Sequence, residues 1–265
     1  MMTVTNIVEL MDKQGLVNIP TGWTQGRAVF GGLIAALMYR ALEQCIGEPL
    51  PVRSLTVSFV APAVAGDLLC EAEVLRRGKS VTQGQCRALQ NGQVVAVLLA
   101  SFGAARTSLV AVEPSLPPVF KAPDECFSLP FIEGMTPEFT RHYAFRWGHG
   151  AMPFSGADRA DIGGWIRPQE SDQPVSVAEL LGLVDAWPPA VLPMLKVPAP
   201  ASSLTWTIEF VGDIHSHTQG LPAGWWQYLA ETEYAADGYV HTRARLWDQA
   251  GALVAISRQT VTVFA

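Results

Sequence analysis

The chain has 265 residues, of which 49% are hydrophobic and 16% are charged, and its formal net charge is -6. This composition supports a sizeable hydrophobic core, in one large domain or in two domains of about 130 residues each, and it excludes a disordered chain. The excess of negative charge argues against nucleic acid or an anionic membrane as a partner, because both would repel the protein.

The cysteines and the first residues bear on the location of the protein. The four cysteines, Cys45, Cys70, Cys86 and Cys126, include no pair with the short spacing of a zinc or redox motif, so we expect buried free thiols in a reducing compartment. The first residues lack the basic and apolar regions of a signal peptide, and no run of about 18 apolar residues could span a membrane. We therefore predict a cytoplasmic protein.

The first element that we predict is a helix over residues 32–44, in the stretch RAVFGGLIAALMY. This helix is apolar on nearly every side and must therefore be buried. Gly31 and Gly32 stand where it begins, as they would in a phosphate-binding loop. The G-x-G-x-x-G pattern and the P-loop lysine are both missing, so a nucleotide cradle is excluded.

Four strands follow the helix, because apolar and polar residues alternate over residues 53–60, 67–76, 79–90 and 93–102. Asn91-Gly92 between the last two runs is a strong hairpin signal. Alternation implies one covered and one wet face, which is typical of an antiparallel sheet. The proline-rich residues 113–130 are then predicted to form a linker without regular structure.

The second half repeats this order. A helix is predicted over residues 177–187, opened by Ser176 and Glu179 as a capping box and closed by Pro188 and Pro189. Strands are predicted over residues 203–211, 225–234, 239–248 and 252–264, with about ten residues inserted around 215–224. The chain thus encodes one helix followed by an antiparallel sheet, twice.

This duplicated arrangement is that of an α+β double hotdog, and several stretches resemble acyl-CoA thioesterase II and its thioesterase-like relatives. They are GRAVFGGLIAALMYRAL, VRSLTVSFVAPAVAGD, EVLRRGKSVTQGQCRALQNGQVV and LVAISRQTV. The resemblance runs from about Thr21 to the C-terminus. It implies an N-terminal hotdog over residues 1–112, a linker over 113–137 and a C-terminal hotdog over 138–265. It also implies hydrolysis of fatty acyl-CoA to free acid and CoA, without a metal or organic cofactor.

The same resemblance implies a site made of an Asp, a hydroxyl residue and a Gln that together activate water. The motifs place these roles on Asp185 in LGLVDAWPP, Ser203 in SSLTWTIEF and Gln259 in VAISRQTV. Thr205-Trp206 stand where the family often has Asp-His, so Ser202 stays an alternative to Ser203.

The residues themselves agree with these roles, and each also fits a purely structural one. Gln259 falls on the more apolar face of its strand, where a carboxamide needs partners; it could also be satisfied by the backbone. Asp185 falls near a helix C-terminus, where the dipole should raise its pKa and make it a better base. A solvated aspartate at a helix end is the alternative. Gly31 and Gly32 could permit close packing against the sheet, or their N–H groups could polarise the thioester carbonyl.

Other functions fit the sequence less well. A relative that binds acyl-CoA or acyl-lipid without hydrolysing it is the main alternative, and a hotdog hydratase is a weaker one because no His accompanies Asp185. His215 and His217 could bind a metal, but no third ligand has a recognisable spacing. No G-x-S-x-G elbow supports a serine nucleophile. Hotdog sheets tend to pair, so we expect a homo-oligomer, such as a dimer of double hotdogs.

Overall fold

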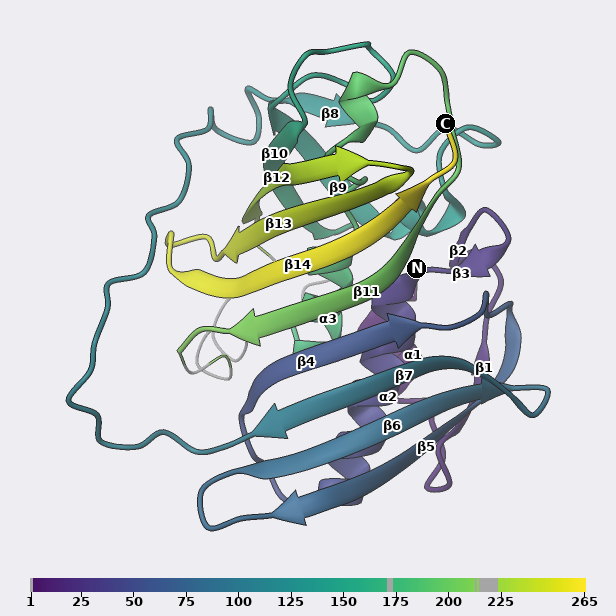
Figure 1. Ribbon diagram of the computed structural model, residues 1–265, viewed down its shortest axis with the longest axis vertical. Coiled ribbons are helices and arrows are strands. Elements are labelled where there is room, and N and C mark those ends of the chain that lie inside the picture. Colours follow the sequence, from purple (N-terminus) through teal and green to yellow (C-terminus); the bar gives the residue numbers. More distant parts are fainter. Residues whose placement is uncertain (1, 171–173, 213, 215–223) are drawn as a thin grey trace.

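The computed structural model describes residues 2–170, 174–212, 214 and 224–265. Its main feature is a twelve-stranded antiparallel sheet that covers two central helices (Figure 1). The helices are α1 (Val4–Val8), α2 (Gly31–Ile46) and α3 (Val177–Asp185), with short 3-10 helices η1 (Glu138–His142) and η2 (Leu192–Met194). The strands, in their order across the sheet, are β1 (Leu16–Ile19), β5 (Gly66–Arg77), β6 (Thr82–Gln90), β7 (Gln93–Phe102), β4 (Val52–Phe59), β11 (Ala201–Phe210), β14 (Leu253–Val263), β13 (Tyr239–Trp247), β12 (Trp226–Ala236), β10 (Asp161–Pro168), β9 (Tyr143–His149) and β8 (Phe127–Leu129). The strands β2 (Thr24–Gln25) and β3 (Ala28–Val29) form a small separate ribbon.

The two halves of the chain have the same strand order, counted outward from the centre of the sheet. β4-β7-β6-β5-β1 in the first half corresponds to β11-β14-β13-β12-β10 in the second, which adds β9 and β8 at its edge. β4 and β11 pair at the centre, with Leu55 opposite Ile208. The predicted double hotdog is therefore confirmed, and its two sheets are joined edge to edge into one.

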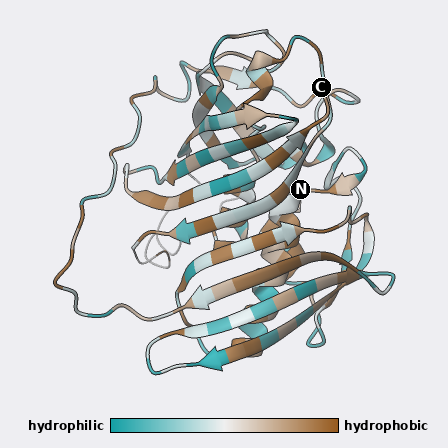
Figure 2. Cartoon of the chain, in the orientation of Figure 1, coloured by the Kyte–Doolittle hydropathy of each residue, from teal (hydrophilic) through white to brown (hydrophobic). Residues whose placement is uncertain are grey.

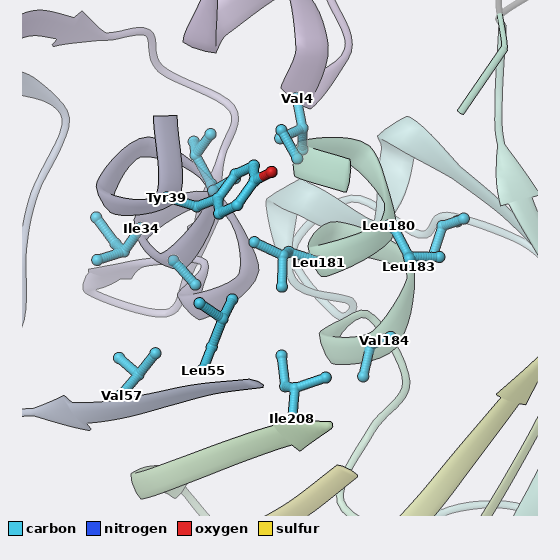
Figure 3. Packing of buried hydrophobic residues seen from close by; sticks show 14 of the residues in the cluster. Val4, Ile34, Tyr39, Leu55, Val57, Leu180, Leu181, Leu183, Val184 and Ile208 are labelled. Carbon is cyan, nitrogen blue, oxygen red and sulfur yellow. The ribbon is translucent and has the colours of Figure 1, made fainter. Parts of the chain in front are cut away.

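The helices α2 and α3 are buried on one face of this sheet. Eleven of the sixteen residues of α2 are buried, as its apolar composition predicts. Gly32 of α2 lies against Gly182 of α3: a Cβ built at Gly32 would be 3.1 Å from the Gly182 Cα. Figure 3 shows the side chains of Leu55 and Ile208 directed from β4 and β11 toward Leu181 of α3. The two halves thus share one hydrophobic core.

Several predicted elements are confirmed, and others were missed. The helices and the four strands of each half lie within a few residues of their predicted bounds. Alternating hydrophobic and hydrophilic bands along the strands in Figure 2 show the pattern that predicted them. The strands β9 and β10 were missed. Gly163 and Gly164 weaken the alternation of β10, and a bulge between them shifts the β9–β10 register.

The predicted capping box is only half correct. Ser176 Oγ accepts a hydrogen bond from the Glu179 N–H at 3.1 Å, as expected. The Glu179 carboxylate accepts instead from the backbone N–H of Thr5, at 3.1 Å, in the first turn of α1. The contact with Thr5 replaces the contact with the Ser176 N–H that a capping box would have, because the free N–H groups at the start of α1 attract a buried carboxylate.

The segment between β7 and β8 passes outside the sheet, where Figure 1 shows it as a long extended strap. Indole N–H groups hold it at two points, since Trp247 donates to the Ser115 carbonyl and Trp165 to the Lys121 carbonyl, each at 2.9 Å. Residues 113–130 are irregular as predicted, except that Phe127–Leu129 form β8. Among the described residues, no helix combines the length and apolar character that crossing a membrane requires.

Candidate active site

Asp185 is the last residue of α3, and Gln259 reaches it from β14. The Gln259 Nε2 donates a hydrogen bond of 2.6 Å to the Asp185 Oδ1. The carboxamide therefore has its partner on the inner face of the sheet, as its position on the apolar face of the strand required. This contact brings together two of the residues that the sequence motifs singled out.

Ser203 joins them because of a β-bulge in β11. Along this strand Trp206, Ile208 and Phe210 are buried, so strict alternation would turn Leu204 and Ser202 inward. The register shifts between Ser203 and Thr205, and the extra residue turns Ser203 inward instead. The Ser203 O–H donates to the Gln259 Oε1 at 3.3 Å. Ser202, the alternative, is exposed, and its backbone carbonyl accepts a hydrogen bond from the Thr262 hydroxyl.

The N-terminus of α2 lies beside the same carboxyl group. Phe30, the N-cap residue of α2, has no side chain that caps the helix. The backbone N–H of Gly32 interacts with the Asp185 carboxyl group, so an acid from the second half supplies the negative charge that the helix start favours. A Cβ built at Gly31 would lie 2.9 Å from the Asp185 Oδ2 and 3.0 Å from the Phe59 Cζ. Only glycine fits here without a shift of its neighbours.

Gly31 and Gly32 both lie in close contact with their neighbours, but only Gly31 contacts the sheet. We expected both to pack against the sheet. Gly31 meets Phe59 of β4, whereas Gly32 faces Phe30 and Gly182 of the second helix. The reason is the central β4–β11 pair, which brings the two hotdog helices together face to face.

Burial raises the pKa of Asp185 from 3.8 to about 7, the largest effect on this group. Hydrogen bonding from Gln259 and from the Gly32 backbone lowers the pKa, but by less. The raised pKa agrees with the expectation, although its cause is loss of water around the carboxyl rather than the helix C-terminus. A carboxyl group with a pKa near neutrality suits proton transfer at physiological pH.

A small cavity of about 10 Å³ adjoins the Gln259 side chain. It is bounded by the end of α3 and the inner faces of β12, β13 and β14, and its polar lining residues include Thr242 and Ser257. Ser257 Oγ accepts from the Trp206 indole at 2.8 Å. Trp187 and Tyr228 form one wall of the cavity; their rings are stacked, with the centroids 5.3 Å apart. The sequence patterns did not single out Thr242 and Trp187 as site residues, although Thr242 alternates with the apolar Val240 and Ala244 on the inner face of β13.

The other candidates lie elsewhere. His215 and His217 are outside the described residues. Within the described part of the chain, no group of three or more His, Cys, Asp or Glu residues could hold a metal ion. All four cysteines are free, but only Cys70 and Cys86 are buried, whereas Cys45 is exposed at the end of α2.

Two family profiles match the chain along most of its length. The acyl-CoA thioesterase N-terminal domain matches residues 19–103, and the acyl-CoA thioesterase C-terminal domain matches residues 123–263. The chain belongs to the acyl-CoA thioesterase family. The resemblance found in the sequence motifs is therefore confirmed. A search of curated proteins found no significant match to this family member.

Solved structures of similar fold agree with this family. A conserved protein of unknown function with a hot dog fold from Alicyclobacillus acidocaldarius is 26% identical, with a TM-score of 0.85, over 94% of this chain and 92% of that one. The tesB protein of Mycobacterium avium subspecies paratuberculosis is 16% identical, with a TM-score of 0.77, over 99% and 98%. An acyl-CoA thioesterase II from Mycobacterium marinum is 20% identical, with a TM-score of 0.70, over 94% and 91%. Family and neighbours together support a thioesterase activity in general.

Proposed function

We propose that the protein hydrolyses acyl-CoA thioesters to free acid and CoA by attack of an activated water. The observation that carries this proposal is the hydrogen-bonded series Ser203–Gln259–Asp185 at the start of α2. It combines a carboxyl group with a pKa of about 7, a hydroxyl and a carboxamide in one partly buried site. These are the groups that a water-activating site needs, and each comes from a different element.

In this mechanism Asp185, as carboxylate, takes a proton from the water. The resulting hydroxide forms a bond to the thioester carbon, and the carbonyl oxygen becomes an oxyanion. When the intermediate collapses, the carbon–sulfur bond breaks, and the CoA sulfur takes the proton held by Asp185. Gln259 and Ser203 orient the carboxylate and the water.

We propose that the oxyanion forms at the start of α2. The N–H groups in the first turn of a helix have no carbonyl partner within the helix, and the helix dipole favours negative charge there. The Gly32 N–H already interacts with Asp185. We therefore assign the oxyanion mainly to the Gly31 N–H and the orientation of the base to that of Gly32.

The main alternative is a protein that binds acyl-CoA or acyl-lipid without turnover. The hydratase alternative is less well supported, because the three histidines in the described part of the chain have partners elsewhere. His142 bonds to the Gly22 carbonyl, His149 to Asp161 and His241 to Thr260. The described site thus offers Asp185 no imidazole for the second proton transfer of a hydration.

One assay distinguishes the three functions. Thiol release is measured from acyl-CoAs of increasing chain length, together with hydration of an enoyl-CoA and binding of each acyl-CoA. We expect thiol release without hydration. Binding without thiol release across the series would identify a binding protein and refute the proposal. The fatty acyl-CoA substrate, the cytoplasmic location, the domain bounds and the homo-oligomer stay predictions.

A further inference from the structure

The 3-10 helix η1 of the second half contacts the segment of the first half that leads into α2. Its side chains at positions three apart lie above each other, so η1 presents two rings on one side. The Phe139 ring stacks on Phe30 and the His142 ring on Trp23; in each pair the ring centroids are 4.0 Å apart and the planes differ by 4°. Trp23 directly precedes β2 and Phe30 directly follows β3. η1 therefore holds both ends of the β2–β3 ribbon.

His142 adds a hydrogen bond to this contact. A carbonyl oxygen only accepts, so the His142 Nε2 carries the proton of the 3.0 Å hydrogen bond to the Gly22 carbonyl. In the described part of the chain, the other ring nitrogen, Nδ1, is buried without a hydrogen-bond partner. Burial lowers the pKa of His142, and the neighbouring Arg141 lowers it further, so the ring is mostly neutral at pH 7. His142 thus acts as a neutral donor.

A continuous series of contacts leads from the ribbon to the candidate active site. The Phe30 N–H donates to the Trp23 carbonyl at 2.8 Å, which ties the N-cap residue of α2 to the start of the ribbon. The buried Phe30 ring lies over the first turn of α2, because a Cβ built at Gly32 would be 2.6 Å from the Phe30 Cζ. The Gly32 N–H in turn interacts with the Asp185 carboxyl group.

We propose that His142 is a positioning residue: together with Phe139 it fixes the start of α2, so that the N–H groups of the first turn keep their places beside Asp185. The inference rests on the proposed thioesterase function and adds a residue outside the series Ser203–Gln259–Asp185. Helix ends fray, and the N-cap residue of α2 has no side-chain cap, so this helix start needs support from outside. Stabilisation of an oxyanion by N–H groups depends on their exact placement, so a loose helix start lowers the rate.

The test compares two substitutions of the same histidine. His142→Phe keeps a flat ring but loses the donor, whereas the Nε2 of His142→Gln can still donate to the Gly22 carbonyl. We expect kcat to fall by about fivefold or more in His142→Phe, with KM within about twofold, and to recover in His142→Gln to within about twofold of the wild type. His241→Phe is the matched control, because His241 also hydrogen-bonds a side chain, Thr260, but on the outer face of β13.

The pH profile separates positioning from a general loss of packing. The Gly32 N–H favours the charged form of Asp185, so a displaced helix start should raise the pKa of this carboxyl group. The midpoint of kcat/KM should therefore move to higher pH by about half a pH unit in His142→Phe and return in His142→Gln. His142 is mostly neutral at pH 7, so its loss removes no charge that could shift the midpoint directly.

The other titratable groups near Asp185 do not obscure this readout. Tyr143 and Tyr228 also face Asp185, but burial raises the pKa of both phenols, so they stay neutral in this range. Burial raises the pKa of Glu179, on the same helix, to about 7. All profiles are therefore measured in the Glu179→Gln background.

Three results would overturn the inference: an unchanged kcat in His142→Phe, a lowered kcat with an unmoved midpoint, or no recovery in His142→Gln. If circular dichroism shows that His142→Phe does not fold, Phe139→Leu takes its place. It weakens only the other ring stack and should move the midpoint in the same direction.

A measurement without substrate keeps the inference separate from the proposed function. If no acyl-CoA releases thiol, the proposed hydrolysis fails, but the pKa of Asp185 is still measured from the NMR chemical shift of its carboxyl carbon, which Asp185→Asn assigns. A higher pKa in His142→Phe than in the wild type would support the positioning role. The same pKa in both proteins would refute it.

Discussion

Gln259 and Asp185 are 74 positions apart in the sequence, yet their side chains form a hydrogen bond of 2.6 Å. Gln259 lies on a strand of the C-terminal sheet and Asp185 ends the helix that this sheet covers. The carboxamide donates to the carboxyl and accepts from Ser203, so it fixes the position of both. Each of these three side chains can be replaced singly, so the contribution of each to hydrolysis is measurable.

Asp185→Asn should reduce kcat for acyl-CoA hydrolysis by about a hundredfold or more, because the amide cannot take a proton from water. The fold should persist, since the Asn side chain has the same shape and the Gln259 amide can turn to match it. Thiol release and circular dichroism measure the two effects. The control is Glu209→Gln, an exposed residue on the outer face of β11. Undiminished turnover in Asp185→Asn would remove Asp185 from the mechanism.

Ser203→Ala and Ser202→Ala form a matched pair that tests the bulge in β11. Loss of the hydrogen bond from Ser203 to Gln259 should lower kcat/KM by about tenfold, which corresponds to roughly 1.4 kcal/mol. Ser202 is exposed and only its carbonyl is bonded, so Ser202→Ala should keep its activity. The reverse result would show that the register in solution is shifted by one residue.

The pH dependence of kcat/KM should follow the Asp185 carboxyl group. Burial raises its pKa to about 7, so activity should rise tenfold per pH unit at acid pH and level off above neutrality. The Gln259 hydrogen bond favours the charged form, and Gln259→Leu should therefore move the midpoint to higher pH as well as lower the plateau. A midpoint that stays the same in Gln259→Leu would mean that another group limits the rate.

Glu179 should make the stability of the protein pH-dependent. Burial raises the pKa of Glu179 from 4.5 to about 7, while its hydrogen bonds to Thr5 lower it by less. The folded state thus retains a proton that the unfolded chain releases. The free energy of unfolding should therefore fall as the pH rises from about 4.5 to 7 and then stay constant.

Glu179→Gln should weaken this fall, because the amide does not titrate. Its oxygen can still accept from the Thr5 N–H, so the contact between α3 and α1 is kept. Denaturant unfolding at pH 5 and pH 8 measures the change, which should be at most about 3 kcal/mol. Glu209→Gln again serves as the control. Asp185 changes stability in the same direction, so some pH dependence should remain. An identical pH dependence in Glu179→Gln and the wild type would contradict the assignment.

Gly31→Ala should lower kcat/KM by about tenfold, because its Cβ would displace the Asp185 carboxyl group or the Phe59 ring. The double variant Gly31→Ala/Phe59→Leu separates these two causes. It relieves the contact with the ring but leaves the contact with Asp185. Activity should stay low in the double variant, and full recovery would assign the loss to Phe59.

The sequence alone was sufficient for the two central helices, for the four predicted strands of each half and for the family. The elements were predicted from the apolar residues on all sides of α2, the alternation along the strands and the Asn91-Gly92 turn. This works because the pattern of neighbouring residues indicates burial and turn geometry. Three stretches of the first half, together with LVAISRQTV around Gln259, predicted the family, which the domain matches confirm. The family's motifs were then matched to Asp185, Ser203 and Gln259. The roles of these three residues stay predictions.

The tertiary structure decided how these residues meet. Strict alternation on β11 would have turned Ser202 inward, and only the bulge opposite β14 turns Ser203 toward Gln259. The pairing of β4 with β11 placed Asp185 at the start of α2, and burial, which no local pattern reveals, raised its pKa. The small cavity lined by Thr242 and Trp187 also depends on long-range packing. Long-range pairing depends on packing across the whole core, whereas sequence patterns report only what adjacent residues prefer.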